Sequence, residues 1–264
     1  MPVITISRGS YSHGKRVAES VAATLGYECV SREAILESSY RFITPGMELF
    51  RTAHNHHAAV DSHAYAKEKY RAYVQKVLLD SFLKDNVVYH GFEGHFFVQK
   101  ISHVLKVRVI ADMDDRMSEE MSRKGITASQ ARKSLEKDDA AHHRWSHYIY
   151  GCDSADPALY DIVIPIHAMG VDDAAEIICR AVQRPCFQPT STSRNAMRML
   201  WLAACIQVSL MEEIPFVKVD VEGKDIVVTI KGNWTDGKEM MNRIGQMMGD
   251  EKGTVGIKVR LLSR

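Results

Sequence analysis

Neither sign of charge dominates this sequence. Its 264 residues carry 34 lysines and arginines against 33 aspartates and glutamates, a formal net charge of +1. Binding a nucleic acid or an acidic membrane surface requires a concentrated basic patch, so we expect neither as a partner, and any anion-binding site has to be local. The hydrophobic content of 45% and the charged content of 25% are typical of a globular protein, which excludes the disordered and fibrous classes.

Cysteines are few, and long apolar runs are missing. The five cysteines never occur in C-x-x-C spacing, which excludes a disulfide framework or a zinc site of the usual kinds and favours a reducing compartment. The most apolar helix candidate, residues 199–211, is too short to cross a bilayer. The first residues also lack the basic region and apolar core of a secretory signal. We therefore expect a cytoplasmic protein.

The first thirty residues contain the clearest functional signal. Residues 3–7 are typical of a buried strand, and Gly9, Gly14 and Lys15 then satisfy the pattern G-x-x-x-x-G-K. In that pattern the glycines let backbone N–H groups face a polyphosphate, and the lysine supplies a cation. A helix predicted to begin at Lys15 would point its positive end at the same anion. The alternative is a glycine-rich turn that only caps a helix.

The predicted phosphate-binding loop covers eight residues: Gly9, Ser10, Tyr11, Ser12, His13, Gly14, Lys15 and Arg16. Arg16 departs from the general motif, which has a serine or threonine there to bind magnesium. The strand before the loop and the helix after it supply the context that phosphate binding requires.

Strands and helices alternate as far as residue 182. After the loop and its helix, strands are predicted at 28–30, 86–90, 106–111 and 161–166. Helices are predicted from Ser31, within 47–84, after Gly91 through His103, near 113, over 127–139 and over 171–182, with a polar aromatic stretch between 139 and 157. This order predicts a three-layer α/β fold with a mainly parallel sheet and ligands at the carboxyl ends of its strands.

The character of the chain then changes. Residues 184–194 contain two prolines and several small hydroxyl residues, as in a linker between the first domain (1–183) and a second one (195–264). The second domain has the predicted order αββαβ, a small α+β domain that resembles BON-type domains in element order. It is close to the lower size limit for independent folding, so we expect it to pack on the first domain, on another copy of the chain or on a protein partner.

With the order of elements established, several stretches carry a family resemblance. They are Ile4 to Arg8, the loop through Lys15, Val17 to Glu19, Gly26-Tyr27 leading to Ser31-Arg32-Glu33, and Asp156-Pro157 with Leu159 to Val163. Residues 1–183 resemble the cytidylate kinase-like branch of the P-loop nucleoside monophosphate kinases. The resemblance implies ATP and Mg²⁺ as cofactors, a nucleoside monophosphate (CMP or dCMP) as acceptor, and a lid that closes on the phosphates.

The resemblance also implies roles for individual residues. The catalytic candidates are Lys15, Arg116 and Arg144; the substrate-binding candidates are Arg32 and Arg41; the lid candidates are Lys133, Lys137, Asp139 and His143. These roles have ordinary alternatives. Arg116 could form a surface ion pair with Glu119 or Glu120, Arg32 and Arg41 could be exposed arginines without a role, and the lid candidates could belong to a solvated charged helix. Asp112 is a candidate magnesium ligand, and a helix N-cap explains it equally well.

Three positions depart from the family pattern. Ala140 and His142 stand where the lid has arginines, and Phe92 follows Gly91 where relatives often have arginine. Arginine binds phosphate through a planar fork that lysine and neutral histidine do not reproduce. The departures motivate a rival hypothesis, a nucleotide-binding regulatory protein with little or no transferase activity. A third hypothesis, an interaction protein without a nucleotide, requires the loop to be accidental.

Histidines gather in two segments. His54, His56, His57 and His63 have a spacing that can hold a transition metal, but a solvated helix facing the substrate cleft is the favoured interpretation. The second group is expected to consist of lid or surface residues rather than metal ligands: His142, His143 and His147.

Overall fold

A five-stranded parallel sheet forms the centre of the first domain. The computed structural model describes residues 2–10, 12–39, 64–92, 94–214, 217–231, 242, 244–246 and 256–262. The strand order is β2-β3-β1-β4-β5, and all four pairings are parallel. The strands are β1 (Val3–Arg8), β2 (Glu28–Ser31), β3 (Val87–Gly91), β4 (Val104–Ala111) and β5 (Ile162–Ile166). The predicted three-layer α/β fold is confirmed.

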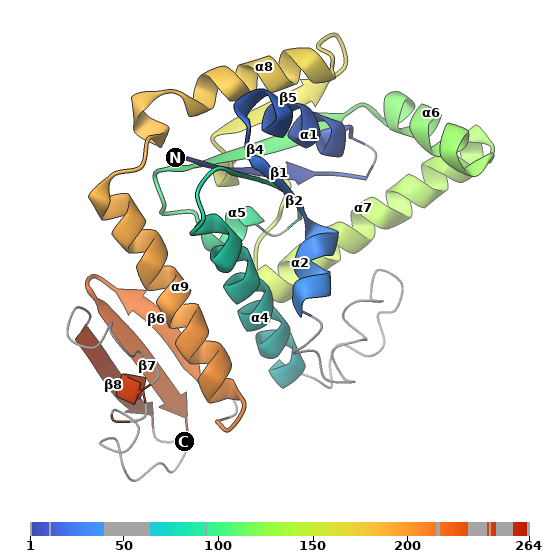
Figure 1. The fold of residues 1–264 in the computed structure, drawn as a ribbon. Coiled ribbons are helices and arrows are strands. Elements are labelled where there is room, and N and C mark those ends of the chain that lie inside the picture. Colours follow the sequence, from blue (N-terminus) through green and yellow to red (C-terminus); the bar gives the residue numbers. More distant parts are fainter. Residues whose placement is uncertain are drawn as a thin grey trace.

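Alternating apolar residues give the sheet two buried faces. In β1, Val3 packs into one hydrophobic cluster, whereas Ile4 and Ile6 pack into another. The second cluster also holds the apolar sides of α1 (Gly14–Leu25) and α8 (Val171–Val182), which lie side by side on that face (Figure 1). On the opposite face lies α4 (Ala64–Phe82), which buries Leu78, Leu79 and Phe82. Helices therefore cover both faces and leave the strand ends accessible.

Two long helices form an antiparallel hairpin that projects from the sheet. They are α6 (Met113–Lys124) and α7 (Ala128–Tyr150) (Figure 1). Gly125 ends α6 with a φ of 65°, and Thr127 forms a capping box with Gln130 at the start of α7. The prediction that the second helix ends near residue 139 is wrong. The helix continues to Tyr150 because aromatic side chains in its last turns pack against the core.

The segment after β3 also differs from its prediction. We expected a helix through His103, whereas α5 (Gly94–Phe97) has only four residues. Tighter turns follow, closed by Val98 N–H to His95 O and Ile101 N–H to Val98 O. These turns bury both Val98 and Ile101. The helix α2 (Arg32–Ser39) begins as predicted, and the rest of the expected helical segment before residue 64 lies outside the described residues.

The C-terminal part contains a second, three-stranded sheet. Its strands are β6 (Lys218–Glu222), β7 (Asp225–Lys231) and β8 (Gly256–Leu262). An antiparallel hairpin joins β6 to β7, and β8 lies parallel to β7, as the order αββαβ requires. Most of the predicted helix between β7 and β8 lies outside the described residues. The resemblance to BON-type domains stays a prediction.

The helix α9 (Ser191–Met211) connects the two parts of the chain. It begins four residues earlier than predicted, inside the proline-containing segment, because Thr190 and Ser193 form a capping box. Its apolar side shares one hydrophobic cluster with α4, β6 and β7. Polar contacts add to this packing: Trp201 donates to Asp80 of α4, and Lys69 of α4 lies 3.3 Å from Glu212. The helix therefore belongs to the core of the first domain and of the second.

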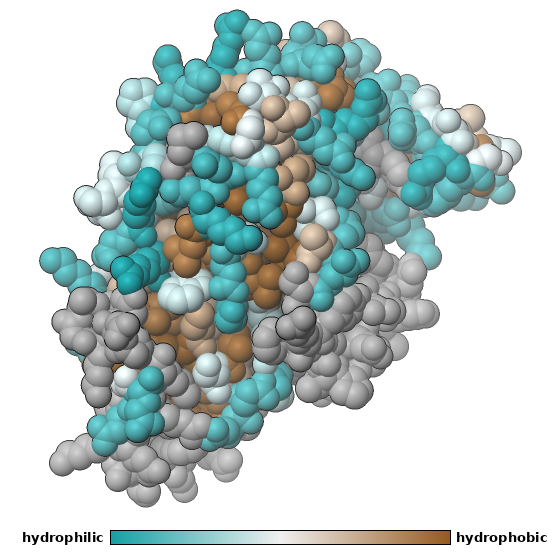
Figure 2. Space-filling model, in the orientation of Figure 1, coloured by the Kyte–Doolittle hydropathy of each residue, from teal (hydrophilic) through white to brown (hydrophobic). Residues whose placement is uncertain are grey.

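Hydrophobic and hydrophilic side chains are also separated on the surface of the molecule. Figure 2 shows hydrophobic side chains between α4 and α9 and a mostly hydrophilic surface at the projecting end of α6 and α7. None of the described helices combines the length and apolar composition of a membrane span.

A substitution in α9 tests this packing. Leu202 is 4% exposed, whereas Leu83, just after α4, is 39% exposed. We expect Leu202→Ala to lower the free energy of unfolding by about 3 kcal/mol because it leaves a cavity in the shared cluster. The matched control Leu83→Ala should cost less than about 1 kcal/mol. Urea denaturation measures both, and equal losses would contradict the packing of α9 into this core.

Candidate functional site

The loop between β1 and α1 is fixed by a close contact with Arg8. A Cβ at Gly14 would lie 2.5 Å from Cβ of Arg8, so only glycine fits there. His13 takes a left-handed conformation (φ 60°, ψ 4°) as the N-cap of α1, and the Ser12 hydroxyl donates to the Gly9 carbonyl at 3.1 Å. A left-handed residue at a helix start turns successive N–H groups toward one side, which forms an anion-binding concavity.

A pocket of about 380 Å³ opens at this loop, and we call it the loop pocket. It is lined by Arg8, Ser10, Ser12, His13, Gly14, Lys15, Arg16, Glu119 and Arg123. Four of these side chains are cationic and one is anionic. Six of the eight predicted loop residues therefore line a single, positively charged pocket at a helix N-terminus, the arrangement that suits a polyphosphate. Gly9 lines the neighbouring pocket instead, and Tyr11 lies outside the described residues.

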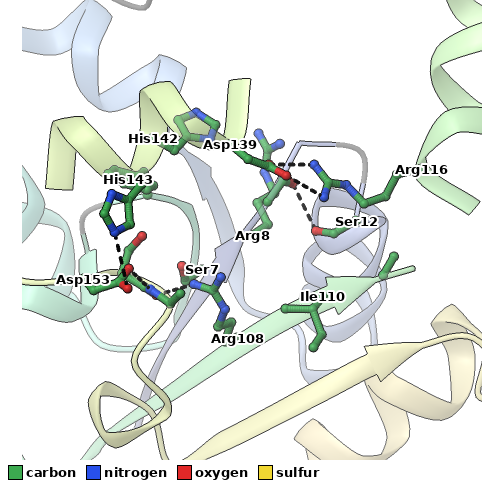
Figure 3. Close-up of a pocket in the computed structure, with 15 residues that line it drawn as sticks. Ser7, Arg8, Ser12, Arg108, Ile110, Arg116, Asp139, His142, His143 and Asp153 are labelled. Carbon is green, nitrogen blue, oxygen red and sulfur yellow. Dashed lines mark hydrogen bonds and ion pairs between the residues drawn. The ribbon is translucent and has the colours of Figure 1, made fainter. Parts of the chain in front are cut away.

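A second pocket of about 300 Å³, the sheet pocket, lies beside the first at the carboxyl ends of β1 and β4 (Figure 3). Its polar and aromatic lining consists of Ser7, Arg8, Ser12, Phe92, Arg108, Arg116, Asp139, His142, His143, Asp153 and Ser154. In this sheet β1 is paired with β3 on one side and with β4 on the other. Ligands of open parallel sheets bind where the strand order reverses in this way.

Arg8 and Ser12 line both pockets. The Nε atom of Arg8 is buried and has no hydrogen-bond partner among the described residues, and its guanidinium reaches Glu33 only at 3.7 Å. A buried donor without a partner costs free energy. The rest of the side chain stands at the boundary between the two pockets.

Arg116 joins the loop to the helical hairpin. Its Nε donates to the Ser10 carbonyl at 2.9 Å, and its two terminal nitrogens donate to both oxygens of Asp139 at 2.9 and 2.7 Å (Figure 3). The side chain is only 12% exposed. The structure thus brings two predicted site residues, Arg116 and Asp139, into one bidentate pair, in place of the ion pair with Glu119 or Glu120.

Two of the positions that depart from the family pattern lie in contact. The rings of Phe92 and His142 stack with centroids 5.2 Å apart and an interplanar angle of 27°. Both residues line the sheet pocket. A flat aromatic pair therefore occupies the wall where the resemblance led us to expect arginines.

A buried network lies below the sheet pocket. The Tyr160 hydroxyl lies 2.8 Å from the Ser154 carbonyl, 3.1 Å from Ser7 Oγ and 3.1 Å from His95 Nε2. Burial, with Arg108 and Lys106 nearby, lowers the pKa of His95 to about 3. A neutral His95 can donate its Nε2 proton to the phenol, so the network holds Ser7 and Ser154 in place without adding charge.

The remaining predicted residues lie elsewhere. Asp112 is the N-cap residue of α6, but its side chain pairs with His167 at 3.2 Å instead of capping the helix. Arg32 begins α2 and lines neither pocket, and Arg41 lies outside the described residues, as does the histidine group from His54 to His63. Three lid or catalytic candidates are exposed on α7 and line neither pocket: Lys133, Lys137 and Arg144.

Several pocket residues had not been singled out from the sequence. Arg8 stands at the end of a buried strand, and Arg108 is one of two charged residues inside the mainly apolar strand β4; both positions are signals that sequence reasoning can use. Arg108 donates to the Ser154 carbonyl and lies over the Tyr160 ring, 5.6 Å from its centroid. Asp153 and Arg123 do not lie in or beside a predicted strand, so nothing in the sequence around them distinguishes them from other charged residues.

The comparisons with known proteins agree with this geometry. A sequence profile described as the cytidylate kinase-like family matches residues 3–168. The chain belongs to the cytidylate kinase-like family. Family membership supports a kinase that acts on a nucleotide or another small molecule. No curated protein matches the chain significantly.

A solved structure shares the fold of this family member over most of the chain. An uncharacterised protein from Eubacterium ventriosum is similar over 70% of this chain and 100% of its own, with 18% identity and a TM-score of 0.54. A shikimate kinase from Bacteroides thetaiotaomicron is similar over 69% of this chain and 99% of its own, with 11% identity and a TM-score of 0.43. At 18% identity, the first likeness concerns the fold alone.

A pair of glycine substitutions tests the loop geometry. We expect Gly14→Ala to lower the free energy of unfolding by about 2 kcal/mol, because the new methyl group overlaps Arg8 and forces the loop to shift. The control is Gly9→Ala, since a Cβ at Gly9 has nothing within 4 Å. It should leave stability unchanged or slightly higher. Urea denaturation separates the two, and the prediction is wrong if Gly9→Ala is the more damaging change.

The buried His95 predicts a pH dependence of stability. Its pKa is about 3 in the folded protein and about 6.5 in an unfolded chain. Below about pH 6.5 the unfolded state binds a proton that the folded state does not, so stability falls as the pH falls. Between about pH 6.5 and about pH 5 the wild type should lose about 2 kcal/mol more than His95→Gln. Urea denaturation at both pH values measures the difference; parallel losses would show that His95 titrates normally.

Proposed function

We propose that this protein transfers the γ-phosphoryl group of ATP to a nucleoside monophosphate, with CMP or dCMP as the acceptor. The observation that carries the proposal is Arg8, whose buried Nε lacks a partner and whose side chain lines both the loop pocket and the sheet pocket. One pocket suits a phosphate donor and the other an acceptor. A phosphoryl group transferred from one pocket to the other would pass the Arg8 side chain.

The loop pocket is the proposed ATP site. The backbone N–H groups near His13 and Gly14, the N-terminus of α1 and the side chain of Lys15 would hold the β- and γ-phosphates. The side chain of Lys15 is 63% exposed, and Glu19 is 3.7 Å from its ammonium group, so the ammonium group is available to a phosphate. Arg16 and Arg123 add positive charge to the same pocket.

The loop residues suit magnesium less well than they suit phosphate. Arg16 is exposed and offers no hydroxyl at the position where the general motif has one, and the Ser12 hydroxyl is engaged by Gly9. Mg²⁺ can bind mainly through substrate phosphates and water. Asp112, the carboxylate we would assign to it, lines neither pocket and lies 3.2 Å from His167. Magnesium would supply neutralisation of the phosphate charge when bound.

The sheet pocket is the proposed acceptor site. Arg108 would orient the acceptor phosphate, and the Phe92–His142 pair offers a flat surface to a nucleobase. A volume of about 300 Å³ is at the small end of ligand pockets. That size favours a pyrimidine over a purine.

In the transfer, an oxygen of the acceptor phosphate forms the new bond to the γ-phosphorus while the bond from the γ-phosphorus to the β–γ bridging oxygen breaks, and ADP leaves. Catalysis of this step rests on positioning and on stabilising charge. Arg8 and Lys15 would neutralise the transferring group, and Arg116, held by Asp139, would keep the hairpin on the loop. Lys133, Lys137 and Arg144 take part in this proposal only if α6 and α7 move closer to the loop.

A coupled assay of ADP formation with CMP, dCMP, UMP and AMP tests the proposal. We expect turnover with CMP or dCMP and little with AMP. Mg-ATP should also raise the melting temperature, because a ligand of the folded state stabilises it by mass action. A melting-temperature rise without turnover on any acceptor would reject the kinase in favour of a nucleotide-binding regulatory protein.

Two variants assign the roles of the cations. Lys15→Ala should abolish the melting-temperature rise with Mg-ATP, because it removes the cation closest to the phosphates. Arg8→Ala keeps the Cβ that packs on Gly14 and should lower kcat by about 100-fold. The control Lys100→Ala removes an exposed lysine that lines neither pocket and should change neither quantity. An unchanged melting-temperature rise in Lys15→Ala would mean that ATP binds elsewhere.

A further inference from the structure

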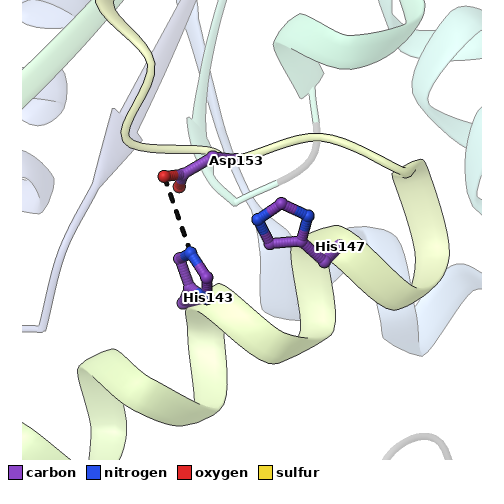
Figure 4. A group of neighbouring side chains, drawn as sticks. All are labelled: His143, His147 and Asp153. Atoms are coloured by element: carbon purple, nitrogen blue, oxygen red, sulfur yellow. Dashed lines mark ion pairs between the residues drawn. The ribbon is translucent and has the colours of Figure 1, made fainter.

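Three possible metal ligands lie together at the edge of the sheet pocket. His143 and His147 project from successive turns of α7, and Asp153 faces them from the segment that follows the helix (Figure 4). One donor atom of each side chain lies within 4.8 Å of the others. His143 Nε2 is 3.6 Å from Asp153 Oδ2, and the two imidazole centroids are 4.5 Å apart.

The local fold already orients the carboxylate. Gly151 ends α7 in a left-handed conformation, which turns the chain back along the helix. Asp153 Oδ1 then accepts a hydrogen bond from Ala155 N–H at 2.8 Å, and the next residue, Ser154, is held by the Ser146 hydroxyl at 3.3 Å. The other carboxylate oxygen, Oδ2, is left facing His143. Hydrogen bonds of this kind around a ligand fix its direction and raise metal affinity.

We propose that His143, His147 and Asp153 bind a divalent transition-metal ion, with Zn²⁺ as the probe of choice. Two imidazoles and a carboxylate suit Zn²⁺, Co²⁺ or Ni²⁺ and are a poor set for Mg²⁺ or Ca²⁺, which prefer oxygen ligands. An ion about 2.1 Å from each donor places the donors roughly 3 to 3.5 Å apart. The His143–Asp153 pair is close to that spacing, and rotation of the exposed His147 side chain brings in the third donor.

Three protein ligands leave at least one coordination position open, as in the catalytic type of zinc site. His143 and Asp153 line the sheet pocket, whereas His147 does not. The open position therefore faces the pocket in which Arg8 and Arg108 already gather positive charge. An anionic oxygen is the ligand that this position would take. The metal site itself does not depend on the proposed kinase activity, because its binding is measured without any nucleotide.

Metal titration of the full-length protein tests the inference. After treatment with a chelator and buffer exchange, isothermal titration with Zn²⁺ should show a site that His147→Gln and Asp153→Asn each weaken by at least about tenfold. Titration with Co²⁺ should give visible d–d absorption that the same variants remove. All three ligands are on the surface, and circular dichroism checks that each variant is folded.

Two control variants exclude other histidine groups. His167→Gln removes the exposed Asp112–Asp115–His167 group, which also has metal-ligand spacing, and the double variant His56→Gln, His57→Gln removes part of the histidine-rich segment. Both should bind Zn²⁺ as the wild type does. Undiminished Zn²⁺ binding in His147→Gln and Asp153→Asn, or its loss in either control, overturns the assignment. Excess Mg²⁺ should not displace Zn²⁺, and displacement would equally contradict it.

Discussion

The contact between Gly14 and Arg8 is the constraint on which the site depends. Because the Arg8 side chain packs against a residue without a Cβ, the loop can close over the end of β1 and α1 can begin at Gly14 with its N–H groups facing outward. The same contact holds the Arg8 guanidinium at the boundary between the two pockets. Packing therefore determines where the loop N–H groups and the Arg8 guanidinium lie. The cations on α6 and β4 add positive charge around them.

Much of the fold follows from local patterns. Short apolar runs separated by helical periodicity predicted the five strands and a mainly parallel sheet, since such runs are buried on both faces of a sheet. Where the prediction was wrong, long-range packing decided. The sequence at the end of α7 looks polar and irregular, yet Trp145, Tyr148 and Tyr150 pack against the hydrophobic core. Their apolar partners are far away in the sequence, so no local pattern could predict this packing.

The site was predictable to the extent that backbone geometry defines it. The loop could be found because glycine spacing and a strand–helix context are local, whereas the sheet pocket is assembled from β1, β4, α7 and the segment after α7. Arg108 and Asp153 are 45 positions apart in the sequence and line the same pocket only in the folded chain. The Phe92–His142 stack illustrates the same limit: each substitution looks like the loss of a phosphate ligand in isolation, and together they form a surface of different chemistry.

The continuity of α7 has a mechanical consequence. A helix of 23 residues is about 34 Å long, and its last turns are anchored in the core by aromatic side chains. Asp139, part-way along the same helix, pairs with Arg116, which also donates to the Ser10 carbonyl of the loop. One continuous helix therefore connects the aromatic contacts of the core to the loop, so the two cannot shift independently of each other.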